Sequence, residues 1–525
     1  MVLMCEIGIA EGKPQVEGYA AGELAASAER VAPGLGLLAG MLAELAGGVA
    51  GPGAAGMSFE QLERRVVAGV RELGVAVLQH ALDARAAAEV RLAGVTGADE
   101  VARPRAVRGA RTIVTVLGAV RVRRIGYRAG VKGVRALFPA DAVLNLPRRR
   151  YSWGLQQLTV LFTQAGSYGQ ARQFVRAATG VAIGKRQLEQ ITAEAAADAA
   201  GFEPALPREQ EAGPLALSPD AKGVAMLPGA LRRRGAKAPA QRARNFEKRR
   251  GTGEKGHKRM AQAGCVFDVA VPDGPPRTPG QVMRPDPGGE PPARPHAVNR
   301  WYTCDITAGR DVTIGKVFDE ADRRDPGHRR TWIALVDGDI YQLGLIQAQA
   351  AARGITLAIL VDFIHVLEYL WKAAWCFHAP RDPAMEDWVI AQALDILHGR
   401  TGEVIARIGQ LAAEHPPKPG GEHAKIIRKT LSYLQNKLPW MDYPQALAAG
   451  WPIATGVIEG ACRHLVQDRM GITGARWSLD GAQAILWLRA IHASGDTGAY
   501  WDYHITQEHQ RNHLSRYQPG FDLAA

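Results

Sequence analysis

Apolar residues recur at every third or fourth position in the stretch SFEQLERRVVAGVRELGVAVLQHALDARAAAEVRLAG, which begins at Ser58. This spacing puts them on one face of a helix, so we predict one long amphipathic helix. Ser58 and Gln61 have the spacing of a capping box at its start. Residues 1–57 are rich in Ala and Gly and poor in aromatic residues, which predicts either a weakly ordered leader or a loosely packed helix.

Apolar and polar residues then alternate on both sides of a Leu-Gly pair in RTIVTVLGAVRVRRIGYR, which predicts a β-hairpin. Three short helical patterns follow within residues 152–200, with breaks near Gly166 and at Gly180. The third pattern begins near Ile183 and carries basic residues at its start, as the recognition helix of a helix-turn-helix does. Any small helical bundle would show the same pattern, so both interpretations stay open.

Residues 214–378 have a different pattern, in which short Val, Ile and Leu runs that end in acidic residues alternate with helical stretches. This alternation is typical of an α/β sheet. Residues 383–447 show only helical patterns and predict a helical insertion. Two further helices are predicted to start near Thr455 and near Leu479.

The overall charge favours a polyanionic partner. The 525 residues include 64 Lys and Arg against 52 Asp and Glu, a net charge of +12. One stretch, RRRGAKAPAQRARNFEKRRGTGEKGHKRM, is strongly basic and would contact phosphates if it lies beside a site, or would be a solvated loop if it does not. A second stretch, PDGPPRTPGQVMRPDPGGEPPARP, is rich in Pro and Gly and predicts a flexible loop.

The five cysteines are scattered without a C-x-x-C pair, so we expect neither a disulfide framework nor a zinc knuckle. The amino terminus lacks the basic start and apolar run of a signal peptide, and no apolar run is long enough to span a bilayer. We therefore expect a cytoplasmic protein with no membrane partner.

Three aspartates directly follow apolar runs: Asp220 after LALSP, Asp337 after IALV and Asp362 after LAILV. Residues in such positions line the crevice at the carboxyl ends of the strands of an open α/β sheet. Carboxylates there can clamp two divalent ions for phosphodiester chemistry, although an Asp after a strand can equally cap a helix or form a turn. A carboxylate pair could also hydrolyse glycosides, which the positive charge of the chain disfavours.

Glu459 lies in the apolar and small-residue stretch PIATGVIEGAC, where a buried charge needs a metal ion or an ion pair with Arg463 on the next turn. His365 follows Asp362 by one helical turn. These two residues could share a metal or form a hydrogen bond, and a capping Asp with a core-facing His explains the spacing equally well. The residues alone do not rank Asp337 against Asp362.

Longer motifs run through most of the chain: GEKGHKRM, FDEADRRDP, ALVDGD, LVDFIHVLEYLWKAAW, PIATGVIEGACRHLVQDRMGITGARWS, LWLRA and YWDYHITQEHQRNH. In these motifs the chain resembles the DDE transposases of bacterial insertion sequences, most closely the ISKra family. The resemblance runs from about Ser152 to His513 and weakens before Leu215. It implies an α/β fold with an RNase H-like catalytic core.

In that core the first acidic ligand lies on strand one, the second on strand four and the third on a later helix. Residue by residue, the resemblance implies that Asp220, Asp337 and Glu459 are both the catalytic residues and the ligands of two Mg²⁺ ions, for which Mn²⁺ can substitute. Asp362 and His365 look like the C/D-x-x-H motif of related groups and would support the ligands or replace one of them. Asp339 is the spare candidate. Ala221 departs from the pattern, because relatives tend to have Gly there.

The resemblance also implies double-stranded DNA as partner, both the terminal inverted repeats of the element and its target, and a homo-oligomer in the synaptic complex. The expected location is the nucleoid of a prokaryotic cytoplasm. The basic residues that we expect to contact DNA are Arg463, His464, Arg469, Arg476, Lys255, Lys258 and Arg259. Arg463 and Arg469 could instead form ion pairs on a helix surface.

The predicted organisation has four parts. Residues 1–57 form the leader, 58–150 the helix and hairpin region, 151–210 a helical and possible helix-turn-helix DNA-binding domain, and 211–525 the catalytic domain with its insertion at about 383–450. Together the leading parts make a mostly helical N-terminal DNA-binding region with a β-hairpin. The expected activity is metal-dependent cleavage at the element ends and strand transfer into target DNA. A catalytically silent DNA-binding repressor and a metal-dependent nuclease are the alternatives.

Overall fold

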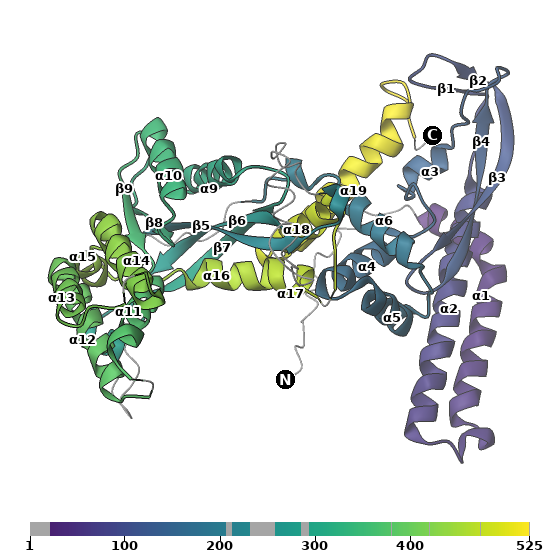
Figure 1. The fold of residues 1–525 in the computed structure, drawn as a ribbon. Helices are drawn as coiled ribbons and strands as arrows, with labels where there is room; N and C mark the ends of the chain where they lie inside the picture. Colours follow the sequence, from purple (N-terminus) through teal and green to yellow (C-terminus); the bar gives the residue numbers. More distant parts are fainter. Residues whose placement is uncertain are drawn as a thin grey trace. The chain divides into compact units, whose positions relative to one another are not determined.

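The structure is a computed structural model (Figure 1). It describes residues 21–205, 213–230, 258–284, 293–379, 381–418, 420–472 and 474–523. The chain forms two compact units, one of residues 1–158, 173–183 and 505–525 and the other of residues 159–172 and 184–504. Within the described part, no helix is both long enough and apolar enough to cross a membrane.

Two long helices, α1 (Ala21–Ala50) and α2 (Phe59–Ala88), pack side by side in the first unit. Ser58 caps α2, and both hydrogen bonds of its capping box with Gln61 are present, as predicted. Helix α1 agrees with the helical one of the two alternatives that the sequence left open for residues 1–57. Residues 1–20 lie outside the described part.

The predicted hairpin is confirmed as the antiparallel strands β3 (Arg105–Val114) and β4 (Ala119–Arg128). Its turn is closed by Thr115, whose hydroxyl accepts hydrogen bonds from the backbone N–H groups of Leu117 and Gly118. The hairpin packs on α2. The short strands β1 (Val95–Thr96) and β2 (Ala102–Arg103) and the helix α3 (Pro139–Val143) complete this part.

Three helices follow, α4 (Trp153–Ala165), α5 (Tyr168–Thr179) and α6 (Lys185–Ala195). Their breaks fall where the sequence predicts them. Gly180 adopts a φ of +74° directly after α5, a conformation that favours glycine.

The second unit contains a five-stranded mixed sheet with the order β7-β6-β5-β8-β9, which confirms the α/β class. Its strands are β5 (Leu215–Ala225), β6 (Lys258–Ala270), β7 (His296–Asp305), β8 (Trp332–Val336) and β9 (Leu357–Val361). Strand β6 is antiparallel to both of its neighbours, β5 and β7, whereas β8 is parallel to β5 and β9 is parallel to β8. Every residue of β8 is buried, as expected for a parallel strand covered on both faces.

Helices cover both faces of this sheet (Figure 1). On one face lie α9 (Arg310–Arg324) and α10 (Ile340–Arg353), which connect β7 to β8 and β8 to β9. On the other lie α16 (Gly456–Ala461) and α18 (Leu479–Ala493), joined by a π-helical segment (Cys462–Gln467) and α17 (Asp468–Met470). Helix α19 (Thr497–Asn512) follows α18. The stretch predicted as a flexible loop contains the short helix α8 (Pro279–Met283), and residues 285–292 of that stretch lie outside the described part.

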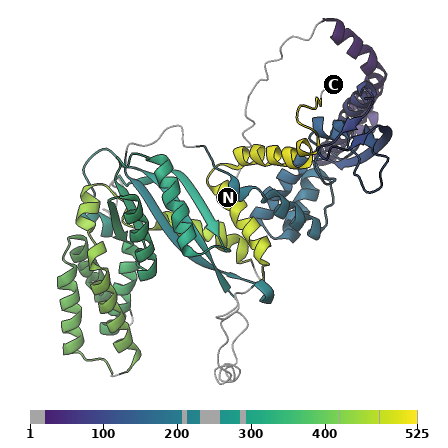
Figure 2. The same ribbon diagram turned by 90° about the horizontal axis from the view of Figure 1, so that it is seen from above.

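The predicted helical insertion is confirmed as a bundle that follows α11 (Phe363–Phe377). Its helices are α12 (Ala384–Leu397), α13 (Thr401–Glu414), α14 (Glu422–Lys437) and α15 (Tyr443–Ala448). Helices α11 to α14 stand side by side, and α14 packs directly on α11 (Figure 2). Because α11 starts where β9 ends, this packing brings the insertion to the carboxyl ends of β8 and β9.

Candidate metal centre

The sheet register brings three aspartates to one level. Leu215 pairs with Trp332, which lies 117 positions later, and Trp332 pairs with Leu357, which lies 25 positions further along. Asp220, Asp337 and Asp362 are separated by the same two intervals, because 337 − 220 = 117 and 362 − 337 = 25. The three residues therefore lie at the same level of the sheet, at the carboxyl ends of β8 and β9, where ligands bind in open α/β sheets. Strand β5 continues beyond this level to Ala225.

The three aspartates differ in exposure. Asp220 lies within β5 and is half-buried, Asp337 directly follows β8 and is exposed, and Asp362 directly follows β9 and is only 1% exposed. Asp337 and Asp220 are thus open to a ligand from solvent, whereas Asp362 belongs to the interior.

Asp362 is held by three hydrogen bonds. Its Oδ1 accepts from the backbone N–H of Ile364 at 2.9 Å, so it caps α11. Its Oδ2 lies 2.9 Å from Nδ1 of His365 and accepts from the hydroxyl of Thr455, the residue before α16. The hydrogen bond to Asp362 raises the pKa of His365 to about 9 against the opposing effect of burial. Asp362 therefore ties the start of α11 to the start of α16.

Glu459 reaches the same place from α16. Its side chain is 48% exposed, and its Oε1 lies 3.9 Å from Nδ1 of His365. Burial raises the pKa of Glu459, the charges of Asp362 and Asp220 raise it further, and His365 acts in the opposite direction. Carboxylates raise one another's pKa only at short range, so Glu459 lies close to Asp362 and Asp220. Arg463, the alternative partner of Glu459, lies instead 4.0 Å from Asp468.

These residues fit a divalent cation. One ligand atom from each of Asp362, His365 and Glu459 lies within 4.8 Å of the others, and the repulsion among the carboxylates would be relieved by positive charge. This group shares Glu459 with the ligand set that the resemblance implies. The two oxygens of Asp362 already accept three hydrogen bonds, so this residue would have to exchange one of them for the ion. His365, whose pKa is raised, would have to release a proton to bind it.

Asp339 is engaged elsewhere. Strand β8 ends at Val336 and Gly338 turns the chain with a φ of +90°, so the strand alternation that would align Asp339 with Asp337 does not continue. Asp339 caps α10 through the N–H of Gln342 and forms an ion pair with Arg310 at 2.6 Å. Burial acts to raise the pKa of Asp339, but these two contacts together lower it.

The basic residues expected to contact DNA are dispersed. Arg469 is 2% exposed, donates its Nε to the carbonyl of Thr163 at 2.7 Å and stacks its guanidinium over Trp477 at 4.6 Å. It is a residue of the interior and not of a helix surface, because these contacts replace the water that a surface arginine keeps. A phosphate contact would require Arg469 to leave both partners. Arg463 and Arg476 are exposed.

The remaining basic candidates lie around β6 and β7. His464 contacts the edge of the Tyr302 ring, with a centroid distance of 5.7 Å. Arg259 donates its Nε to the carbonyl of Ile306 at 2.6 Å, and Lys258 is exposed at the start of β6. Lys255 lies outside the described residues.

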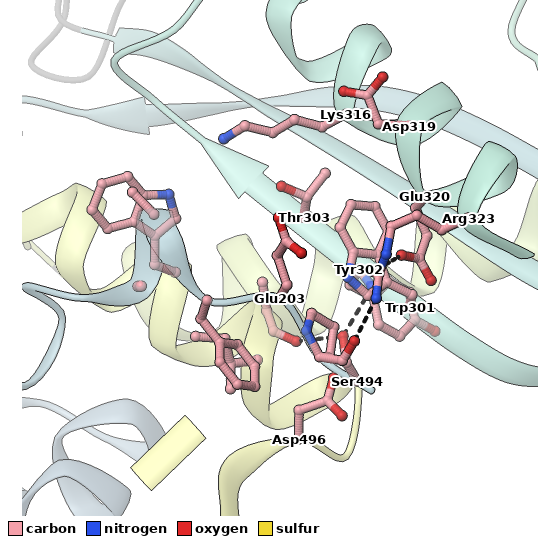
Figure 3. Close-up of a pocket in the computed structure, with 17 residues that line it drawn as sticks. Glu203, Trp301, Tyr302, Thr303, Lys316, Asp319, Glu320, Arg323, Ser494 and Asp496 are labelled. Atoms are coloured by element: carbon pink, nitrogen blue, oxygen red, sulfur yellow. Dashed lines mark hydrogen bonds and ion pairs between the residues drawn. The ribbon is translucent and has the colours of Figure 1, made fainter. Parts of the chain in front are cut away.

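A cavity of about 320 Å³ lies apart from the carboxylates, at the β7 edge of the sheet (Figure 3). The backbone N–H of Tyr302 donates to the hydroxyl of Ser494 at 2.9 Å, so this group of the edge strand has a hydrogen-bond partner. Glu320 and Arg323 of α9 form an ion pair at 2.6 Å. Burial, and then the charge of Glu320, raise the pKa of Asp496 to about 6. The cavity lining carries more acidic than basic side chains, and Asp220, Asp337 and Asp362 do not belong to it.

Two tyrosines of the insertion contact the ends of the strands that carry the aspartates. The hydroxyl of Tyr433 on α14 donates to the backbone carbonyl of Asp337 at 3.3 Å, and that of Tyr443 on α15 donates to the carbonyl of Val361 at 2.9 Å. Sequence reasoning missed both residues. Each sits in an ordinary amphipathic helix pattern, so no local signal distinguishes it from a core tyrosine.

The chain matches none of the models of known protein families with which it was compared, and none of the curated proteins.

Proposed function

We propose that the protein is a DNA transposase with an RNase H-like core, in which Asp220, Asp337 and Glu459 hold two Mg²⁺ ions. The observation that carries this proposal is the common level of the aspartates on neighbouring parallel strands, with the helix of Glu459 packed against β5 and β6. Counted along the chain within this sheet, Asp220 lies on the first strand and Asp337 follows the fourth. These are the positions that the resemblance to DDE transposases implies.

The charge of the chain supports the same proposal. With a net charge of +12, the protein would attract a polyanion, and a substrate such as double-stranded DNA brings phosphates to the carboxylates. The proposed substrates are the inverted repeats at the element ends and the target DNA, held by a homo-oligomer.

The roles of the residues follow from their positions. When bound, two Mg²⁺ ions would activate the attacking oxygen and stabilise the leaving oxygen. Asp220 and Asp337, on neighbouring strands, would hold the ions between them, and Glu459 would complete the site from α16. His365, bonded to Asp362 and 3.9 Å from Glu459, would orient that carboxylate. Hydrolysis at the element end leaves a 3′-OH, which then attacks a phosphodiester of the target in line, so no covalent bond to the protein forms.

The experiment is a cleavage and joining assay with Mg²⁺ and DNA that carries the inverted repeats flanking the coding region. We expect wild-type protein to cut at the repeat ends and to give joined products, and Asp337→Asn to abolish both while repeat binding persists. Asp387→Asn is the matched control, since that side chain is 73% exposed on α12. Cleavage without joined products would instead identify a nuclease, and binding without cleavage a repressor; either result overturns the proposal.

A further inference from the structure

Lys437, the last residue of α14, is a buried cation without an acceptor. The residue is 4% exposed, and among the described residues its Nζ has no hydrogen-bond partner. Burying an ammonium group without a hydrogen bond or an ion pair is costly. Nothing in the packing of α14 requires a charge there, because an apolar side chain of the same length would fill the same space. The charge itself therefore calls for an explanation.

The ammonium group lies beside the loop 337–339. Lys437 packs so closely on Gly338 that a methyl group added to that glycine would lie 3.2 Å from Cε of the lysine. Gly338 is flanked by Asp337 and Asp339, and both carboxylates favour the charged form of Lys437, against the effect of burial that lowers its pKa. The Nζ also lies 5.6 Å from the centre of the Trp440 ring.

Helix α14 holds this loop at a second point. Tyr433, one turn before Lys437, donates to the carbonyl of Asp337 and stacks on Tyr369 of α11 at a ring distance of 3.9 Å. The insertion therefore fixes both the backbone and the electrostatic surroundings of Asp337. A fixed positive charge near a carboxylate stabilises it in the absence of metal, and it repels a divalent cation twice as strongly as a monovalent one at the same distance.

We propose that Lys437 is a positioning residue of the metal centre, whose charge balances Asp337 in the metal-free protein and opposes binding of the divalent ion until DNA is present. This inference rests on the proposed role of Asp337 as a ligand. The phosphates of bound DNA add the negative charge that offsets Lys437, so the ions bind tightly only together with the substrate. The helical insertion thereby couples metal loading to DNA binding.

The test is Mn²⁺ binding to the full-length protein, measured by titration calorimetry without DNA. Lys437→Met removes the charge and keeps the length of the side chain, so we expect it to bind Mn²⁺ about tenfold more tightly than wild type. Lys437→Arg should bind like wild type because it keeps the charge. Lys429→Met is the matched control, since Lys429 is exposed on the same helix and its loss should leave the affinity unchanged.

A lysine that only supports the fold would give the opposite sign or no change. Unchanged or weaker Mn²⁺ binding by Lys437→Met would therefore overturn the proposal. Lys437→Gln provides a second neutral variant, and failure of both neutral variants to fold would also overturn it. In the Asp337→Asn background the gain from Lys437→Met should disappear if the lysine acts through that carboxylate.

With DNA present, wild-type affinity for Mn²⁺ should approach that of Lys437→Met, and a difference that persists counts against the coupling. The calorimetry without DNA does not depend on catalysis, so its result can refute the role of Lys437 without refuting the transposase proposal. If the protein never cuts DNA but Lys437→Met binds Mn²⁺ more tightly, the role of the lysine stands and the transposase proposal falls.

Discussion

Replacing Asp362 by Asn tests whether this residue supports the site or binds the metal. The side chain is 1% exposed, and its Oδ2 receives hydrogen bonds from both His365 and Thr455. Asn keeps the volume and can keep the bond from Ile364 with its single oxygen. It loses the charge, however, and its NH₂ group, which is a hydrogen-bond donor, then faces His365 and Thr455, which are donors as well.

The cost can be worked out from these contacts. A hydrogen bond to a charged group contributes about 1.5–3 kcal/mol, so the loss of two should destabilise the protein by about 3–6 kcal/mol. Removing one partner of a buried ion pair destabilises a protein by about the same amount. Asp337→Asn should cost no more than about 1 kcal/mol, because its side chain is exposed and its oxygen can still accept from the N–H of Asp339. The carboxylate of Asp339 still favours the charged form of Lys437 in this variant.

The assay is urea unfolding in EDTA, followed by circular dichroism, together with Mg²⁺-dependent cleavage for each variant. We expect Asp362→Asn to unfold at lower urea and to keep partial activity, and Asp337→Asn to unfold like wild type and to be inactive. The reasoning is refuted if Asp362→Asn is fully stable but inactive while Asp337→Asn still cleaves. In that case the metal ligands would run through Asp362.

Three further predictions concern stability in the metal-free protein. The hydrogen bond to Asp362 raises the pKa of His365 to about 9, so its contribution is complete below pH 6.5 and is lost as the pH rises through 9. Since the side chain of His365 is 32% exposed, solvent screens this contribution, and urea unfolding should show a loss of about 1–2 kcal/mol in the free energy of unfolding over this range. The loss should be absent in His365→Gln. Burial raises the pKa of Asp496 to about 6, so Asp496→Asn should stabilise by about 1 kcal/mol at pH 7 and have no effect below pH 4; an equal effect at both pH values would contradict this. Tyr443→Phe leaves the carbonyl of Val361 without its donor and should cost about 1–2 kcal/mol in the same assay without changing Mn²⁺ affinity.

The spacing of residues within short segments predicted much of the secondary structure of this protein. The capping box at Ser58, the hairpin and the helices of the insertion appear where the spacing predicts them. Such features depend on residues within a few positions of one another, whose relative placement is fixed by the geometry of a helix or a strand. For the same reason the sequence identified Asp220, Asp337 and Asp362, each directly after or within a strand.

The tertiary structure decided how those residues differ. The sequence did not rank Asp337 against Asp362, and only the packing of α16 on β5 and β6 brings Thr455 to Asp362. The contact of His365 with Asp362, by contrast, spans a single turn of α11. Arg469 looked like a surface residue because its burial depends on α4, whose residue Thr163 lies 306 positions earlier in the chain. Lys437 comes to lie beside Gly338 across about 100 positions of chain. Contacts of this kind follow from how whole helices pack on the sheet, and no spacing within a single segment encodes them.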